Sequence, residues 1–129
     1  MNLLFQLIII FFLGTYNNFN PSNLPTGSLS IKNKSVNIGS IVEGKTISIN
    51  FEIKNISNKS VNIFSVSTTC GCTIVKYPKK IDAKKHIFIN ATFNSKGFIG
   101  PVKKELVLIT DDSLKYYKME IIGRVIKYN

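Results

Sequence analysis

Two cysteines, Cys70 and Cys72, are the residues whose type and spacing best suit chemistry. They are the only cysteines of the chain, and Gly71 alone separates them. Residues two apart in an extended strand have Cα atoms about 6.6–6.8 Å apart, the upper limit for a disulfide. A tighter backbone at Gly71 would join the sulfurs in a strained, easily reduced ring. One interpretation is therefore a redox or disulfide site.

Two other interpretations of the same motif stay open. Two thiolates on one face suit a soft metal such as Cu(I) or Zn(II), but a closed zinc site needs further ligands, and only His86 and Met119 could add to it. Alternatively, the cysteines are small apolar residues at a strand start, and Gly71 permits a sharp turn. The nearest cation in sequence is Lys76, so nothing immediately beside Cys70 lowers a thiol pKa. We therefore favour the structural role and keep the other two as alternatives.

No other set of residues predicts catalysis. General acid–base chemistry needs two carboxylates in one cleft, and the seven acidic residues fall mostly in predicted turns or on polar strand faces. Asp111 and Asp112 suit a turn better than a calcium site. His86, the single histidine, is expected to face solvent on a strand. The sequence thus predicts a non-enzymatic protein without a metal or other cofactor.

The first 28 residues are expected to precede the folded domain. Residues 3–13 form an apolar run broken only by Gln6, roughly half the length that crosses a bilayer. The run fits a signal peptide or short anchor within residues 1–15, although no Lys or Arg precedes it and no Ala-x-Ala site follows. Residues 16–28, rich in Asn and Pro, are typical of a linker. We expect an extracytoplasmic protein, periplasmic or anchored on the outer side of the inner membrane, with its domain at 29–129.

Alternation of apolar and polar residues dominates that domain. It is clearest over 47–54 and 87–93, and a change of phase within 61–66 indicates a bulge or burial on both faces. Polar turns separate the segments at 55–59, 94–97 and 111–113. Gly100 and Pro101 are expected to form a further break. Some seven short strands predict an immunoglobulin-like antiparallel β-sandwich. Its core must be aliphatic and Phe, because the chain has no tryptophan and no cysteine pair spaced to join two sheets.

The chain is strongly basic, with a formal net charge of +10. Its lysines are scattered and cluster only at 79–80 with 84–85. A nucleic-acid binder would more often show arginine forks and aromatic residues on one face, whereas Arg124 is the only arginine here. We therefore attribute the charge to composition and predict no nucleic-acid partner.

Four motifs follow one another along residues 36–126. They are Val36–Gly44, Phe51–Asn58, Val66–Thr73 with its Cys-Gly-Cys, and Phe93–Gly97 followed by Gly123 and Val125. Together they resemble the bacterial "domain of unknown function 1573" family, whose Ser-Cys-Gly-Cys-Thr signature the third motif matches most specifically. The resemblance implies an exported immunoglobulin-like domain and no assigned activity. Two turns depart from the family pattern and are expected to be less tightly specified: Asp82–Lys85 replaces a usual Pro-Gly, and Ser57 replaces a usual glycine.

These observations predict a binding or structural module at the cell envelope. Its partner would be an unidentified envelope protein, and strand addition at a sheet edge is one way to bind it. Membrane association is expected only through the N-terminal segment. The alternative function is thiol-redox chemistry or soft-metal handling by Cys70 and Cys72.

Overall fold

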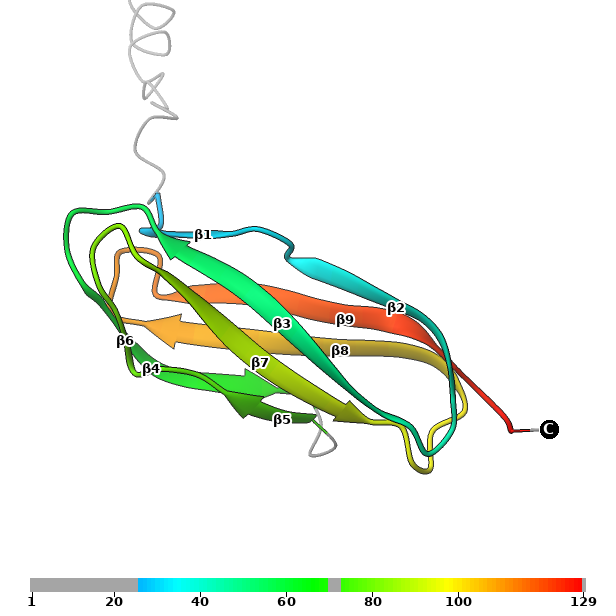
Figure 1. Ribbon diagram of the computed structural model, residues 1–129. Helices are drawn as coiled ribbons and strands as arrows, with labels where there is room; N and C mark the ends of the chain where they lie inside the picture. The colour runs from blue at the N-terminus through cyan, green and yellow to red at the C-terminus, as the bar shows by residue number, and fades with distance from the viewer. Residues whose placement is uncertain (1–25, 70–72, 129) are drawn as a thin grey trace, which may run out of the picture.

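The alternating segments form strands, and the strands form two stacked sheets (Figure 1). The structure is a computed structural model that describes residues 26–69 and 73–128. The strands in these ranges are β1 Leu29–Ile31, β2 Ser35–Val42, β3 Thr46–Asn55, β4 Val61–Thr68, β5 Thr73–Lys76, β6 Lys80–Ile81, β7 His86–Asn94, β8 Gly100–Thr110 and β9 Tyr116–Ile126. No helix long and apolar enough to cross a membrane occurs in the described ranges.

The sheet order is that of an immunoglobulin-like sandwich, which confirms the predicted fold class. One sheet runs β1-β3-β7-β5 and the other β2-β9-β8-β4-β6. The strands beyond the expected seven are β1 and β6, with three and two residues, too short for any alternation to reveal. One pairing is not antiparallel as predicted: β2 runs parallel to β9. The chain passes from β1 in one sheet to β2 in the other and so borders its own last strand.

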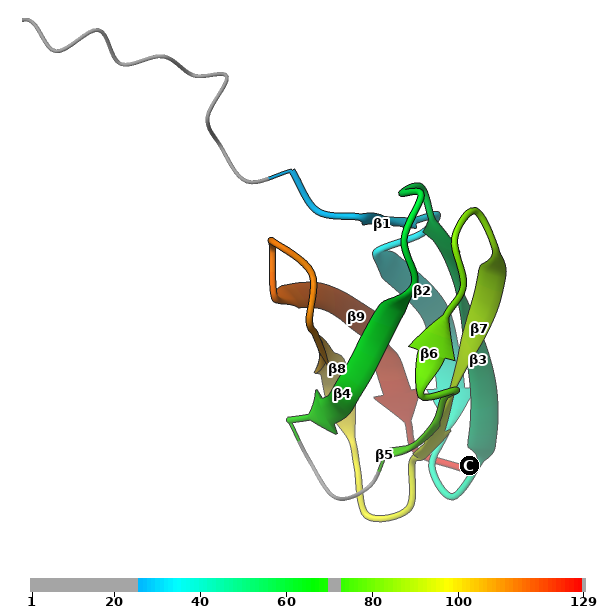
Figure 2. The ribbon, with the colours of Figure 1, turned by 90° about the vertical axis from the view of Figure 1, so that its left-hand side faces the viewer.

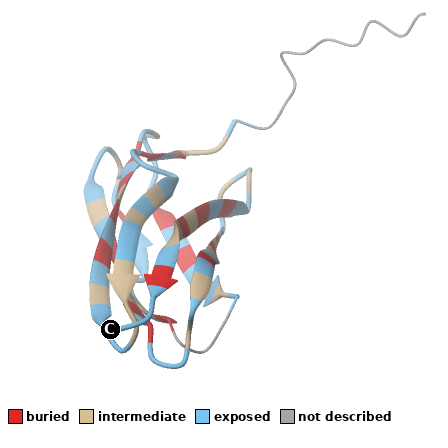
Figure 3. Ribbon diagram, turned by 90° about the vertical axis from the view of Figure 1, so that its right-hand side faces the viewer, coloured by how far each residue is buried: buried red, intermediate tan, exposed pale blue. Residues whose placement is uncertain are grey.

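The core lies between the sheets and is aliphatic and aromatic, as the composition requires. Buried residues alternate with exposed ones along the strands (Figure 3). The largest fully buried apolar side chains are Phe51, Phe93, Ile53, Ile81, Ile89, Leu106, Leu108, Met119, Ile121 and Val125. Because inward residues follow period two, the outer faces carry the polar half of each strand.

The phase change predicted in β4 is a β-bulge. Ile63 pairs with Thr110 and Ser65 with Ile109, so Phe64 is the extra residue between them. The side chain of Phe64 is consequently turned to the outside, where it is 65% exposed.

The break predicted at Gly100 and Pro101 is wrong. Both residues belong to β8 and pair with Val125 and Arg124 of β9. Because β4 ends opposite Leu106, β8 is an edge strand at Pro101, and a residue without an N–H is tolerated at such an edge.

The two unusual turns are held by specific contacts. The Ser57 hydroxyl lies 2.8 Å from Asn55 Oδ1 and 2.9 Å from the Lys59 carbonyl oxygen, and its single proton is shared between these two acceptors. Asn55 itself, predicted as a turn residue, is the fully buried end of β3. Lys84 adopts φ +63°, the left-handed region that favours glycine, and its ammonium donates to the Ile56 carbonyl at 2.6 Å.

Three loops and the start of β1 gather at one end of the sandwich, here called the N-terminal pole (Figures 1 and 2). The loops are 56–60, 82–85 and 111–115, and the entering chain is 26–28. Ser28 accepts a backbone bond from Ile56, and the Ser113 hydroxyl donates to the Thr26 carbonyl. The β2–β3 and β7–β8 loops and the C-terminus lie at the opposite end (Figure 1).

Candidate functional site

Cys70, Gly71 and Cys72 lie outside the described residues, but both residues that flank them are placed. Thr69 donates its N–H to the Glu105 carbonyl at 3.1 Å, and its hydroxyl accepts the Glu105 N–H at 3.2 Å. Thr73 begins β5 and pairs with Phe93 of β7. The motif therefore connects β4 of one sheet with β5 of the other, which is a crossing rather than a hairpin within one sheet.

A lysine far along the chain lies near the strand partners of the residues that flank the motif. The Lys104 ammonium lies 4.3 Å from the centroid of the Phe98 ring and 6.0 Å from that of Phe93, the strand partner of Thr73. Its backbone neighbour Glu105 holds Thr69. Along the sequence, Lys76 is the cation nearest to the motif. Only the fold brings Lys104 to the frame of the motif, by which we mean the flanking residues Thr69 and Thr73 and their strand partners Glu105 and Phe93.

Of the two further metal ligands considered from the sequence, His86 lies far from the residues that flank the motif and Met119 lies in the core. His86 is at the other end of β7 from Phe93, seven residues and about 23 Å away. Met119 belongs to β9, opposite Leu106 of β8, and its side chain is in the core, 1% exposed. Within the described ranges, no three His, Cys, Asp or Glu side chains are placed to hold a metal ion together.

His86 lies on the solvent-exposed face, as predicted, and contacts a carboxylate. Its Nδ1 is 3.1 Å from Glu52 Oε1, and the Lys32 ammonium is 3.1 Å from Glu52 Oε2. The Lys32 hydrogen bond, aided by His86, holds the pKa of Glu52 below its ordinary value. These exposed pairs join β1, β3 and β7 on the outer face and are of small energetic weight.

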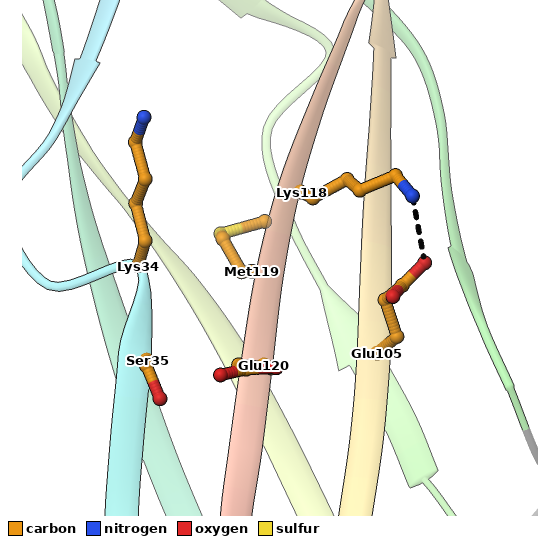
Figure 4. A pocket seen from close by; sticks show the side chains of 6 residues that line it. All are labelled: Lys34, Ser35, Glu105, Lys118, Met119 and Glu120. Atoms are coloured by element: carbon orange, nitrogen blue, oxygen red, sulfur yellow. Dashed lines mark ion pairs between the residues drawn. The ribbon is translucent and has the colours of Figure 1, made fainter.

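The structure brings two carboxylates together that sequence reasoning had kept apart. Glu105 of β8 and Glu120 of β9 are directly opposite in register, and both line a shallow hollow of about 160 Å³ beside the start of β2 (Figure 4). Lys118 lies 3.5 Å from Glu105, and Lys103 lies 3.5 Å from Glu120. Each negative charge thus has a diagonal lysine, which compensates the like-charge repulsion across the strands.

The other predicted acidic pair is structural. Asp111 accepts hydrogen bonds from the Asn62 N–H and side-chain amide. Asp112 accepts the Ser28 N–H at 2.7 Å, the Thr110 hydroxyl at 2.9 Å and a short bond from the Tyr117 hydroxyl. Both aspartates are therefore engaged in the β8–β9 turn, as expected of turn residues.

Asp112 and Tyr117 fasten the entering chain to the β8–β9 turn. The Tyr117 hydroxyl also accepts the buried Leu29 N–H at 3.1 Å. Burial opposes ionisation of Asp112, but hydrogen bonds from Tyr117, Ser28 and Thr110 outweigh it and lower the pKa of Asp112. Burial and the bond to Asp112 raise the pKa of Tyr117. Gly27 fits here because a Cβ would lie 2.2 Å from the Tyr117 hydroxyl.

Among the described strands, β2 is the longest that lies at the edge of a sheet. β2 borders β9 on one side and is the last strand of its sheet. Its eight residues, SVNIGSIV, include no charged residue and no proline. Natural edges are usually shortened, charged or interrupted by proline, because free N–H and C=O groups invite another strand.

The direction of the free backbone groups follows from the register. Glu120 donates to the Lys34 carbonyl and Glu43 donates to the Ile126 carbonyl, so in this parallel ladder Val36 and Ile41 bond to β9. The intervening residues Ser35, Asn37 and Ser40 direct their N–H and C=O groups away from β9. A bulge at Gly39, with φ +67°, separates the two halves of the strand.

Comparison with protein families decides what kind of chain this is. The family model described as "Protein of unknown function (DUF1573)" matches residues 29–125. The chain belongs to the DUF1573 family. No curated protein matches it.

Solved structures share the fold of this DUF1573 domain at low identity. A protein of unknown function from Porphyromonas gingivalis W83 is 15% identical with a TM-score of 0.66, covering 81% of this chain and 51% of that one, so this chain spans about half its length. A PapD-like domain of human CEP192 is 16% identical with a TM-score of 0.68, covering 85% and 94%. The YadV chaperone is 14% identical with a TM-score of 0.58, covering 76% and 52%. These similarities establish the sandwich fold and nothing more.

Proposed function

We propose that this DUF1573 domain is a non-enzymatic, exported binding module of the cell envelope, and that it binds an extended segment of a partner protein along the edge of β2. The partner strand would extend the five-stranded sheet by one. The observation that carries the proposal is the length and chemistry of this edge, eight uncharged residues with outward backbone groups at Ser35, Asn37 and Ser40.

Two features of β2 suit recognition. Val36, Ile38 and Ile41 pack partly against the core, so the strand is fixed from one side while its other side stays open. The bulge at Gly39 divides the free groups into two short sets, which limits unspecific pairing and imposes a register on an incoming strand.

The state of the acidic residues supports a non-catalytic role. All seven carboxylates have a partner in the described ranges: Glu43 accepts the Gly97 N–H, Asp82 lies 2.9 Å from the Lys80 ammonium, and the others form the pairs and turn bonds given above. General acid–base catalysis requires a group poised to exchange a proton with a substrate, whereas each of these carboxylates stabilises a turn or a sheet face.

Site-specific photo-crosslinking in cells of the native host tests the binding edge. A photoreactive phenylalanine analogue at Ser40 should give one discrete protein adduct. The matched control is the same analogue at Thr92, which is half-buried on β7 and has β3 and β5 on either side. Equal adducts at both positions, or none at Ser40, would overturn the proposal for β2.

Export is tested separately by the mass and location of the mature protein. We expect protease added to intact spheroplasts to degrade the chain, which would support an extracytoplasmic position. Protection from the protease would indicate a cytoplasmic position. A mature mass lacking about 15 N-terminal residues would indicate a cleaved signal peptide, and the full mass would indicate a short anchor.

One observation favours a second candidate, a thiol-redox function of Cys70 and Cys72. Lys104 adds a cation beside the frame of the motif, and a nearby ammonium lowers a thiol pKa. Thiol labelling with and without reductant, together with metal analysis, tests this function. Two freely reacting thiols, no bound metal and an unchanged fold in Cys→Ser variants would exclude both the redox and the metal roles.

A further inference from the structure

We propose that the partner at the β2 edge is a second copy of this chain, related by a two-fold axis, so that the two β2 strands pair antiparallel and join the two five-stranded sheets. The inference rests on the use of the β2 edge proposed above and names its occupant. It is carried by the self-complementarity of residues 34–43, because one register matches backbone groups, apolar side chains and charges together.

The outward backbone groups of β2 select this register. Both neighbours of Val42 bond to β9, so the N–H and C=O of Val42 point outward. The outward set is therefore Ser35, Asn37, Ser40 and Val42. In the proposed register, Ser35 lies opposite Val42 of the second copy. Asn37 then lies opposite Ser40, so every outward residue has a partner, whereas any other antiparallel register within β2 matches at most half of the set.

The bulge at Gly39 fits the same symmetry. It adds one residue between Asn37 and Ser40 relative to β9, and Asn37 Oδ1 accepts the Gly39 N–H at 2.8 Å. In the two-fold register the bulges of the two copies lie opposite each other, so the spacing between the two halves of β2 is the same on both strands. The bulge therefore does not interrupt pairing with a second copy.

Apolar side chains are matched between the outward positions. Val36 lies opposite Ile41 of the second copy, and the two-fold axis repeats this pair. Both residues face the core side, because they pair with the buried Ile121 and Val125 of β9, and both are only partly buried in one chain. Pairs between the hydrogen-bonded positions of an antiparallel ladder bring their side chains closest. The second copy thus covers apolar surface that the edge of a single chain leaves open.

Charges at the two ends of β2 complement each other in the same register. Lys34 directly precedes the strand and Glu43 directly follows it, and the backbone of each still bonds to β9. The register places Lys34 of each copy opposite Glu43 of the other. Neither residue has an ion pair within the described part of the chain. An unrelated extended segment would match the backbone groups, but it gives no reason for opposite charges at the two ends.

A charge reversal at Lys34 tests this register. We expect the purified full chain to form a dimer in sedimentation equilibrium. Lys34→Glu places two glutamates opposite each other at both ends of the paired strands and should weaken dimerisation about tenfold or more. Lys76→Glu is the matched control, with the same change in net charge at an exposed position of β5 in the other sheet. A general charge effect would instead strengthen the association of both variants, because both lower the repulsion between basic chains.

A charge exchange provides the second arm. Combining Lys34→Glu with Glu43→Lys in one chain restores opposite charges and should restore dimerisation. An equimolar mixture of the two single variants should likewise form a heterodimer. If Glu43→Lys does not fold, the comparison of Lys34→Glu with Lys76→Glu decides alone. A monomeric native chain, or equal dimerisation of Lys34→Glu and Lys76→Glu, overturns the proposal.

The photo-crosslinked adduct at Ser40 separates this inference from the proposed function. An adduct with the mass of two chains supports both. An adduct with a different protein, together with a monomeric purified chain, overturns the second copy as the occupant and leaves strand addition at β2 intact. The absence of any adduct at Ser40 overturns the use of this edge, and the inference with it.

Discussion

The contact between Asp112 and Tyr117 allows the most quantitative prediction. Tyr117→Phe deletes one hydroxyl, which donates to the Asp112 carboxylate and accepts the buried Leu29 N–H. Losing a hydrogen bond to a charged group costs about 1.5–3 kcal/mol, and an unsatisfied buried N–H adds about 1–3 kcal/mol. Because Asp112 is partly open to water and keeps its other donors, we expect the lower part of that sum, a loss of about 3 kcal/mol in the free energy of unfolding.

Urea denaturation followed by far-ultraviolet circular dichroism measures this loss. For a domain of this size, about 3 kcal/mol corresponds to a decrease in Tm of about 12–20 °C. Tyr116→Phe is the matched control, because that ring is exposed on the other face of the same strand, and it should change stability by less than about 0.5 kcal/mol. Equal stability of the two variants would refute the idea that the Tyr117 hydroxyl fastens β1 to the β8–β9 turn.

The same contact predicts the pH dependence of stability. The lowered pKa of Asp112 contributes stability above the ordinary carboxyl pKa, and this contribution is lost as the pH falls through the pKa of the folded state. The raised pKa of Tyr117 contributes stability below about pH 10, which is lost as the pH rises beyond it. The difference in the free energy of unfolding between the native chain and Tyr117→Phe should therefore decrease below about pH 4 and above about pH 10. A difference independent of pH would contradict this.

Three other substitutions test separate parts of the fold. Asn55→Ala leaves the Ile81 and Lys59 carbonyls without their donor and should lower the free energy of unfolding by about 2–4 kcal/mol in urea denaturation. A loss no larger than that of a surface substitution would argue against a structural role of the Asn55 side chain. Gly123→Ala places a Cβ 2.4 Å from Ile38 Cγ1 and 2.7 Å from the Gly39 carbonyl oxygen; it should cost about 1–3 kcal/mol and speed amide exchange in β2, and unchanged exchange would contradict the close β2–β9 packing. Lys84→Gly removes a left-handed non-glycine residue and should be about 1 kcal/mol more stable than Lys85→Gly, which the same denaturation series checks.

Elements with a sustained alternation were predictable, and elements that depend on distant partners were not. The strands β3, β7 and β9 each repeat the period-two pattern over nine residues or more, and the bulge at Phe64 showed as a change of phase. β1 and β6 exist because β3 and β4 offer them a few backbone groups, so their own sequences hold no signal. The parallel course of β2 is a property of the whole sandwich, since it depends on which sheet the chain joins after β1.

The candidate sites divide in the same way. The opposition of Glu105 and Glu120 was available in principle, because a hairpin centred on the turn at 111–115 places them across from each other. The approach of Lys104 to the frame of the cysteine motif was not, because it depends on the β4–β8 register and on the crossing between sheets. For Asp112, the turn was predictable, but the hydroxyl that it binds belongs to an inward-facing residue that alternation alone marks as core.

Binding along the edge of β2 is the central claim, and proline substitution tests it most directly. Ser35 and Ser40 direct their N–H groups away from β9, so Ser35→Pro with Ser40→Pro removes two outward donors and spares the β2–β9 ladder. With the photoreactive residue at Lys34, and with Ser35→Ala plus Ser40→Ala as the control, we predict that the proline pair loses the adduct at least about tenfold while its unfolding free energy stays within about 1 kcal/mol. If the double variant is too unstable, Ser35→Pro alone, at the first residue of the strand, serves the same purpose. An undiminished adduct in a folded proline variant would contradict strand addition at β2.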